Sequence, residues 1–268
     1  MKRKKRRLIP KLVPVFLLLL LYSNYKLVVR TYTVKLKGLP QEFEQYKIAQ
    51  ISDLHGREIL TAQLLRALNR RQPDIIAITG DFIDEENQLE PLVPFLKALC
   101  AIAPCYYVTG NHEWAGIHTE EFLKRLRETG VVPLRNGFTE LIRNGASVTL
   151  AGVEDKHGYA DMITPSMLAE KMPAGVSILL CHRPDEFKSL ANDGYSLVLS
   201  GHVHGGLIRL PYFGGLFGPG RVFLPEYTSG LYREGESQMI VSRGLAASKL
   251  LPRLFNAPEL TMVRLSAE

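Results

Sequence analysis

Two histidines stand two positions apart where an apolar run gives way to glycines. His202 and His204 belong to the segment LVLSGHVHGG, residues 197–206. Residues i and i+2 of an extended chain project to the same side, and glycine lets the backbone approach a ligand closely. Such a pair can hold a metal ion or simply pack inside the protein. The choice between these readings depends on partners elsewhere in the chain.

Four other short segments carry nitrogen or oxygen donors directly after apolar runs. They are SDLHG, GDFID, GNHE and CHRPD, which supply Asp53, His55, Asp81, Asp84, Asn111, His112, Glu113 and His182. Each segment alone has an ordinary explanation, because Asp, Asn and Gly are common in turns and caps. Five such segments that together hold five of the seven histidines favour a metal site. We interpret the other two, His118 and His157, as solvated or structural.

The chemistry of these donors indicates the kind of ion. Carboxylates, imidazoles and an amide without thiolates suit divalent ions such as Mn²⁺, Fe²⁺, Zn²⁺ or Mg²⁺. Roughly seven ligands exceed what one ion requires, so we expect two ions that share a carboxylate, an arrangement used to hydrolyse phosphate esters. The chain has no nucleophile elbow, Walker A loop or Rossmann fingerprint that would compete for this role.

Alternating strands and helices must position these residues. Helical patterns cover 61–71, 89–99 and 119–130, the last with Thr119 as its expected N-cap and Gly130 at its end. Residues 30–36 alternate like an edge strand, and apolar runs precede every donor segment. This pattern predicts a layered α/β sheet in one domain. Ligands of such sheets bind beyond the carboxyl ends of the strands, which is where all five donor segments fall.

Charge and cysteine content exclude some classes of protein. The 268 residues carry a formal charge of +6, but residues 2–7 are six consecutive basic residues, so the rest of the chain is neutral. We therefore expect no nucleic-acid partner. Cys100, Cys105 and Cys181 are too few for a disulfide framework and lie in or beside apolar runs. We expect them to act as small buried apolar residues.

The N-terminus is predicted to attach the protein to the cell membrane. A short apolar run follows the basic residues, and no small-residue cleavage site comes after it. Residues 1–29 are therefore interpreted as a basic tail with an uncleaved transmembrane anchor, or alternatively a signal segment, and residues 30–268 as the catalytic domain. The positive-inside rule would leave the catalytic domain outside the cytoplasm.

A known family shows the same motifs in the same order. DLH, GDFID, GNHE, the lone CH and GHVHGG closely resemble the motifs of the calcineurin-like metallophosphoesterases. The later segments LYREGESQMIVSRGLAAS and RLFNAPELTMVRL resemble the bacterial membrane-associated branch of that superfamily. The resemblance covers roughly residues 45–265. It implies an α/β fold, a four-layer α/β/β/α sandwich with two mixed β-sheets, and a metal-dependent phosphoric ester hydrolase.

The resemblance also implies a role for each motif residue. The first metal ion would be held by Asp53, His55 and His204, the second by Asn111, His182 and His202, and Asp81 would bridge both. His112 matches the proton donor of the family, and Asp84 matches the carboxylate that orients it. Mn²⁺ is the first expectation for both ions, with Fe, Zn or Mg as alternatives.

The expected reaction is hydrolysis of a phosphate ester or pyrophosphate by a hydroxide that bridges the two metals. The substrate would be a phosphorylated small molecule or a lipid-linked phosphate, and the protein would be a monomer. The aromatic loop at 207–227 either packs as core or presents Phe213, Leu216 and Phe217, partly exposed beside the metals, to a bilayer or to an acyl chain. The alternatives are a non-catalytic scaffold with this fold, or a nuclease-type phosphodiesterase.

Overall fold

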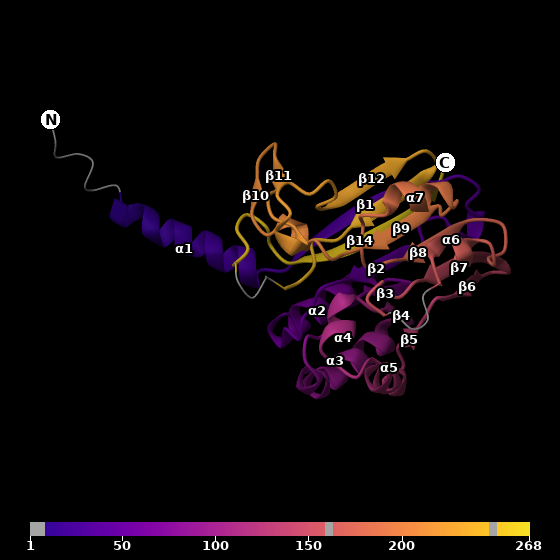
Figure 1. Ribbon diagram of the computed structural model, residues 1–268, viewed down its shortest axis with the longest axis horizontal. Helices are drawn as coiled ribbons and strands as arrows, with labels where there is room; N and C mark the ends of the chain where they lie inside the picture. Colours follow the sequence, from indigo (N-terminus) through magenta and orange to yellow (C-terminus); the bar gives the residue numbers. More distant parts are fainter. Residues whose placement is uncertain (1–8, 159–162, 247–250) are drawn as a thin grey trace.

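Two six-stranded β-sheets lie face to face in a computed structural model, which describes residues 9–158, 163–246 and 251–268 (Figure 1). The first sheet has the order β1 (Val28–Leu36), β14 (Glu259–Ala267), β2 (Lys47–Ile51), β3 (Ile75–Thr79), β4 (Cys105–Val108), β5 (Val132–Pro133). The second has the order β12 (Gly230–Glu234), β13 (Ser237–Val241), β9 (Leu197–Ser200), β8 (Ser177–Leu180), β7 (Ala146–Gly152), β6 (Gly137–Arg143).

Helices cover the outer face of each sheet. The first sheet carries α2 (Thr61–Arg71), α3 (Leu89–Ile102) and α5 (Thr119–Glu128), and the second carries α6 (Pro165–Ala169) and α7 (Phe187–Asn192). Side chains of one strand alternate between the two sides of a sheet. Accordingly, Ile76 and Ile78 of β3 pack under the helices, while Ala77 between them faces the second sheet. The expected four-layer α/β/β/α sandwich is confirmed.

The strand directions bring the donor segments to one edge. Strands β2, β3 and β4 are mutually parallel, as are β7, β8, β9 and β13. The carboxyl ends of the two sheets also touch, since the Gln50 amide donates to Ser200 O at 2.9 Å and to Thr79 Oγ1 at 3.0 Å. Loops that leave these strands therefore share one region of the molecule.

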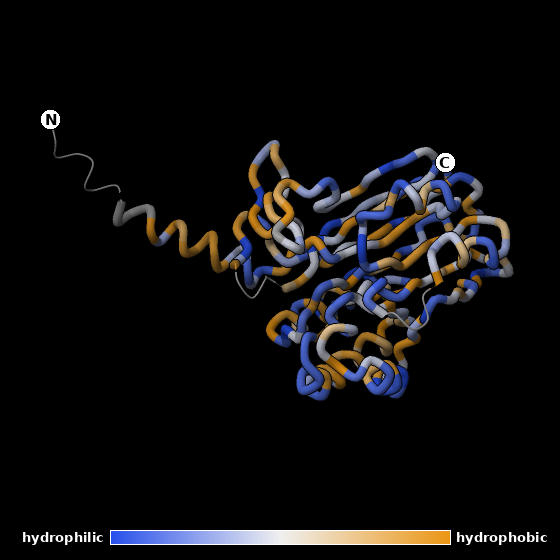
Figure 2. Tube along the Cα trace, viewed as in Figure 1, coloured by the Kyte–Doolittle hydropathy of each residue, from blue (hydrophilic) through white to orange (hydrophobic). Residues whose placement is uncertain are grey.

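The expected transmembrane anchor is wrong. Helix α1 (Ile9–Tyr25) projects from the body of the protein and is mostly apolar (Figures 1 and 2). Its 17 residues rise by about 26 Å, short of a hydrocarbon core of about 30 Å. Across residues 9–158, 163–246 and 251–268, none of the helices combines the length and the apolar character that crossing a membrane requires. The predicted localisation, which depended on that anchor, is therefore not supported.

Most predicted elements have the expected positions. Helix α2 begins and ends at the predicted residues, and β1 is an edge strand. The expected N-cap of α5 is wrong, because His118 occupies that position. Thr119 instead donates its hydroxyl to Glu113 O at 2.6 Å, which ties the start of α5 to α4 (Asn111–Ala115).

The loop after His204 presents aromatic side chains to solvent. It contains the two-residue strands β10 (Arg209–Leu210) and β11 (Gly214–Gly215). Phe213 is 70% exposed and Phe223 is 63% exposed, whereas Leu216 and Phe217 are partly buried. Packing of the whole loop as core is therefore wrong. The three cysteines are free, with Cys105 buried and the other two partly buried.

Candidate metal centre

The five donor segments leave the carboxyl ends of five strands, as predicted. The residues that follow β2 are Asp53 and His55; those after β3 are Asp81 and Asp84; those after β4 are Asn111 and His112; His182 follows β8; and His202 and His204 follow β9. Both sheets thus contribute donors to one site.

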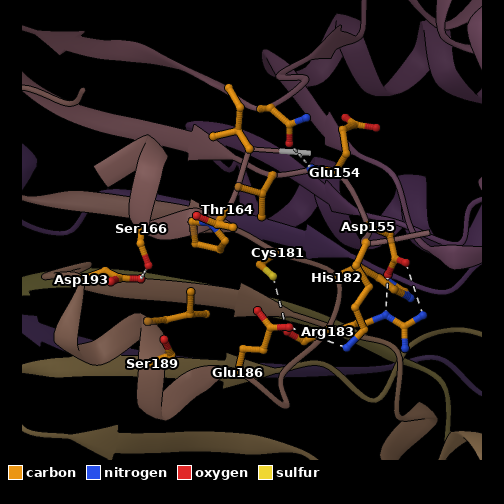
Figure 3. Close-up of a pocket in the computed structure, with 16 residues that line it drawn as sticks. Glu154, Asp155, Thr164, Ser166, Cys181, His182, Arg183, Glu186, Ser189 and Asp193 are labelled. Atoms are coloured by element: carbon orange, nitrogen blue, oxygen red, sulfur yellow. Dashed lines mark hydrogen bonds and ion pairs between the residues drawn. The ribbon is translucent and has the colours of Figure 1, made fainter. Parts of the chain in front are cut away.

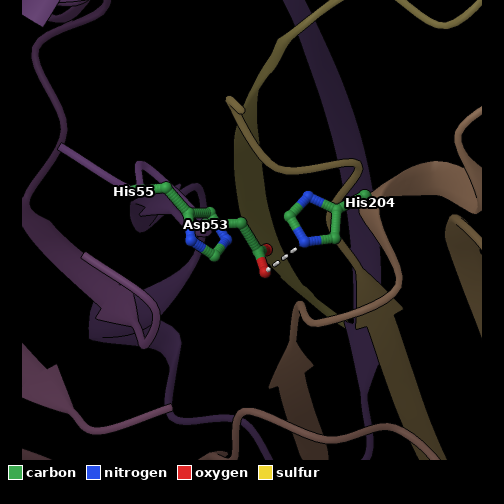
Figure 4. A group of neighbouring side chains, drawn as sticks. All are labelled: Asp53, His55 and His204. Carbon is green, nitrogen blue, oxygen red and sulfur yellow. Dashed lines mark ion pairs between the residues drawn. The ribbon is translucent and has the colours of Figure 1, made fainter. Parts of the chain in front are cut away.

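Asp53, His55 and His204, the predicted ligands of the first metal, lie together. One ligand atom from each of the three falls within 4.8 Å of the others. The His204 Nε2 atom is 3.7 Å from Asp53 Oδ1, and the three side chains point toward a common point (Figure 4). One carboxyl-end loop of the first sheet, after β2, and one of the second, after β9, therefore form this group.

A second group consists of Asp81, His182 and His202, again with ligand atoms within 4.8 Å of one another. Asp81 Oδ2 is 3.2 Å from His182 Nε2, and His182 Nε2 is 3.1 Å from His202 Nδ1. The same Asp81 oxygen lies 3.7 Å from His55 Nε2 of the first group. One carboxylate oxygen thus faces both groups, which is the position that a bridging ligand requires.

Two buried polar atoms test whether a metal fits. His55 Nε2 and Asn111 Oδ1 are buried and have no hydrogen-bond partner among the residues that the structure describes. A buried polar group without a partner costs about 1–3 kcal/mol, so such atoms are rare in folded proteins. A divalent cation would satisfy both, and the donor set contains the nitrogen and oxygen ligands that such ions prefer. The residues present fit a metal centre.

Backbone carbonyls orient two of the imidazoles. His182 Nδ1 lies 2.8 Å from Thr79 O, and His204 Nδ1 lies 3.2 Å from Ala246 O. A carbonyl accepts only from an N–H, so each contact places the proton on Nδ1 and leaves Nε2 as the ligand atom. Such outer hydrogen bonds are a regular feature of metal-binding histidines.

The backbone of the site is strained at several ligands. Positive φ angles occur at Asp53 (53°), His55 (47°), Asp81 (52°), His202 (70°) and His204 (50°). Residues other than glycine rarely adopt this conformation, which costs of order 1–3 kcal/mol per residue and is concentrated at functional sites. The strain places the donor side chains at the turn immediately after each strand.

Burial and neighbouring charges shift the pKa values of several residues in the site. Burial opposes ionisation of Asp81, but the imidazoles of His182, His55 and His112 outweigh it and hold the pKa of Asp81 well below its usual range. Burial likewise opposes the charge on His182, yet Asp81 raises its pKa to about 10. Burial lowers the pKa of His202 to about 2 and that of His204 to about 4. The last two imidazoles are therefore neutral and able to bind a cation.

His112 and Asp84, the predicted proton donor and its partner, are in contact. His112 Nδ1 is 2.8 Å from Asp84 Oδ1, and the same oxygen is 2.5 Å from His55 Nδ1. The hydrogen bond to Asp84 is the largest of the influences that raise the pKa of His112. The side chain of His112 is 39% exposed, so its Nε2 can meet a substrate.

Glu113 supports the site and is not a ligand. Its buried carboxylate accepts hydrogen bonds from the backbone N–H groups of Asp81, Phe82 and Gly110 at 2.6–3.0 Å. These bonds hold the GDFID and GNHE loops against each other. Sequence patterns did not separate this role from metal binding, because both use a carboxylate after a strand.

Sequence analysis missed a cluster centred on Arg183. Its guanidinium bonds the buried Asp155 carboxylate through Nε at 2.7 Å and Nη2 at 3.3 Å, and Nη2 also lies 2.9 Å from His157 Nδ1. Arg183 directly follows His182 in the chain, which was the available signal. His157 belongs to this cluster near the metal centre, whereas His118 is 83% exposed and pairs with Glu86.

Comparison with known proteins identifies the family. The family model for calcineurin-like phosphoesterases matches residues 46–206, more than half of the chain, and the protein belongs to this family. It is a metal-dependent phosphoester hydrolase. The uncharacterized metallophosphoesterase YkuE of Bacillus subtilis is 32% identical over 248 residues, covering 88% of this chain and 84% of its own. The phosphodiesterase YaeI of Escherichia coli is 29% identical, with 82% of each chain covered.

A solved structure shows the same fold. The NAD nucleotidase of Haemophilus influenzae superposes with a TM-score of 0.52 over 75% of this chain and 45% of its own, at 14% sequence identity. At this level of identity the likeness concerns the fold alone.

Proposed function

We propose that the protein hydrolyses a phosphate ester or pyrophosphate with two divalent ions, Mn²⁺ first among the candidates, and with His112 as the general acid. The observation that carries this proposal is the position of Asp81 Oδ2, which faces His182 on one side and His55 on the other. Two separate ligand groups that share one carboxylate suit two ions better than one.

The bound ions would polarise the phosphate oxygens and lower the pKa of a water molecule, so that hydroxide forms near neutral pH. The chain contributes the remaining steps. Asp53 and Asp81 would hold the ions together with the imidazoles of His55, His182, His202 and His204. The protein forms no covalent intermediate in this scheme.

His112 would protonate the departing oxygen from Nε2. Asp84 accepts from Nδ1, which fixes the ring orientation and favours the imidazolium. General acid catalysis of this kind contributes typically about 10²–10⁴-fold to the rate. The effect is greatest for a strongly basic leaving group, which departs slowly unless it is protonated.

Phosphorylated small molecules and lipid-linked phosphates are the proposed substrates. A diester specificity draws support from the similarity to the phosphodiesterase YaeI, and an apolar substituent draws support from exposed Phe213 and Phe223 near His204 in the chain. A non-catalytic scaffold is disfavoured, because it would have no use for strained, unpartnered donors such as His55 Nε2. A nuclease is disfavoured by the neutral charge of the chain after its basic start.

The leaving-group dependence of His112→Asn tests the proposal. With metal-loaded protein and a series of aryl and alkyl phosphates, we expect losses of about 10²-fold or more for poor leaving groups and much smaller losses for nitrophenyl esters. The variant should bind metal as the wild type does. Equal losses across the series would exclude His112 as the general acid, and wild-type activity without any divalent ion would exclude the metal mechanism.

A further inference from the structure

A cavity of about 520 Å³ adjoins the metal centre. Asn111 and His202, two predicted ligands of the second metal, form part of its lining. Ligand-binding cavities typically measure about 300–1,000 Å³, and a phosphate group alone needs far less. The space is therefore suited to the organic part of a substrate whose phosphoryl group lies on the metals.

Much of the remaining lining, here called the wall, is apolar. It contains Val203, Val222, Pro225 and Tyr227. The Tyr227 ring packs edge-on against Phe187 and Tyr232, with centroids 6.0 and 5.0 Å apart. Such packing fixes the aromatic wall before any ligand binds, which lowers the entropic cost of binding.

Backbone hydrogen bonds attach this wall to the His204 turn. Leu216 N and Phe217 N both donate to Gly206 O at 3.1 Å, and Gly218 N donates to Val222 O at 2.8 Å. The loop that forms the wall thus starts from the same turn that carries two predicted ligands. These backbone hydrogen bonds therefore fix the position of the wall relative to the predicted ligands.

Arg183 lies where the cavity meets the metal centre. Asp155 holds one edge of its guanidinium (Figure 3), while Nη1 points to His202 Nε2 at 3.1 Å. A guanidinium nitrogen can only donate, so His202 Nε2 accepts in this contact, and the cation stands at the border between the cavity and the second ligand group. An oxygen of a phosphoryl group is an acceptor that a guanidinium binds strongly.

The acidic residues at the cavity are each paired with a lysine. Asp185 lies 3.3 Å from Lys156 Nζ, and Glu226 lies 2.9 Å from Lys188 Nζ. These carboxylates are therefore partly neutralised and leave the apolar wall and Arg183 to define the chemistry of the cavity.

We propose that Arg183 binds an oxygen of the substrate phosphoryl group and that the adjoining cavity binds an apolar or aromatic ester substituent. The preferred substrates are then phosphoesters with a sizeable apolar group, whether aryl or alkyl. This inference rests on the proposed function of the same metal centre.

Binding of phosphonates, which cannot be hydrolysed at the carbon–phosphorus bond, separates the two parts of this site. Calorimetry on Mn²⁺-loaded protein would compare methyl-, phenyl- and octylphosphonate. We expect phenyl- or octylphosphonate to bind at least about tenfold more tightly than methylphosphonate, and the preferred one distinguishes an aryl from an alkyl specificity. Val222→Trp should remove this preference. Val132→Trp, an exposed position that lines neither the metal centre nor the cavity, is the matched control and should retain it.

The role of Arg183 is tested with the same probes. Arg183→Gln should weaken all three phosphonates about ten- to hundredfold and raise KM more than it lowers kcat. Arg183→Lys should recover part of the affinity, and the metal content of both variants should match the wild type. Equal affinity for the three phosphonates, or a preference that survives Val222→Trp, would overturn the cavity assignment; unchanged binding in Arg183→Gln would overturn the arginine assignment. Failure of the proposed function looks different, because methylphosphonate binding would then not depend on metal.

Discussion

The Asp81 carboxylate connects the two halves of the metal centre. Oδ2 faces the imidazoles of both ligand groups, and Oδ1 accepts the backbone N–H of His112 at 2.9 Å. The neighbouring Gly110 is required for this arrangement, because a Cβ there would lie 2.2 Å from Asp81 Oδ1. A single side chain thus positions the ligands and the peptide of the proposed acid.

The pairing of Asp84 with His112 predicts a pH effect at the scale of one residue. Asp84→Asn replaces the charged hydrogen-bond acceptor that does most to raise the pKa of His112 with a neutral one, so the protonated acid is lost at lower pH. We expect the alkaline limb of the kcat profile to move down by about one pH unit or more. Glu86→Gln, which removes the partner of the exposed His118, is the matched control and should leave the limb in place. An unshifted limb in Asp84→Asn would contradict the assigned acid.

At the scale of elements, the ends of β4 and β7 meet through one hydroxyl. Thr109 Oγ1 donates to Glu154 Oε2 at 2.6 Å and accepts from Trp114 Nε1 at 2.7 Å. Burial raises the pKa of Glu154 to about 7. The group is therefore protonated in the fold at a pH where the unfolded chain is already ionised.

This shift makes stability depend on pH. Because the folded pKa is raised, the contribution of neutral Glu154 is complete below its unfolded pKa and is lost as pH rises through about 7. The Glu154→Gln variant has no ionisable group at this position, so its stability should fall less as the pH rises. Between pH 5 and pH 8 its unfolding free energy should gain about 1–3 kcal/mol relative to the wild type. Urea denaturation at both pH values measures this difference, and parallel pH profiles for the two proteins would be inconsistent with a buried, protonated Glu154.

Strand periodicity and motif spacing predicted the strands of the fold and the donor residues at their carboxyl ends, because both patterns follow from local chemistry. Alternating apolar runs mark the strands, and the donors that end them fall at one sheet edge in any parallel α/β layer. The N-cap of α5 was mispredicted because Thr119 bonds a carbonyl of α4, a contact no local pattern reveals. The Arg183–Asp155 pair was missed for the same reason, since 28 residues separate its members.

Across the whole molecule, the end of α1 contacts the segment around Arg253, which lies near the C-terminal strand in sequence. Asn24, in the last turn of α1, exchanges two hydrogen bonds of 3.0 Å with the backbone of Arg253. The buried guanidinium of Arg253 donates through Nε to Ala246 O at 2.8 Å, the same carbonyl that orients His204. Apolar character in the N-terminal segment suggested an anchor, whereas the structure shows that the end of this helix packs onto the catalytic body.

This connection predicts a distant effect on metal binding. Asn24→Ala should lower the affinity for the ion at His204, Asp53 and His55 about two- to tenfold, because loss of an outer partner leaves His204 less firmly oriented. Asn69→Ala is the matched control, since Asn69 makes the same kind of bond to a carbonyl four residues earlier as Asn24 does, at an exposed position. Titration of metal-free protein with Co²⁺, followed by visible absorption, measures the affinity. Reduced stability with unchanged affinity would show that the contact is purely structural.

The bridging role of Asp81 is the central claim about the molecule, and metal analysis of Asp81→Asn tests it most directly. Protein stripped with chelator and dialysed against Mn²⁺ should bind two ions per chain in the wild type. The Asp81→Asn substitution removes the shared negative charge, so the affinity for each of the two ions should fall by about tenfold or more. His204→Asn should mainly affect one of them. An Asp81→Asn protein that retains two ions with wild-type affinity would contradict the account.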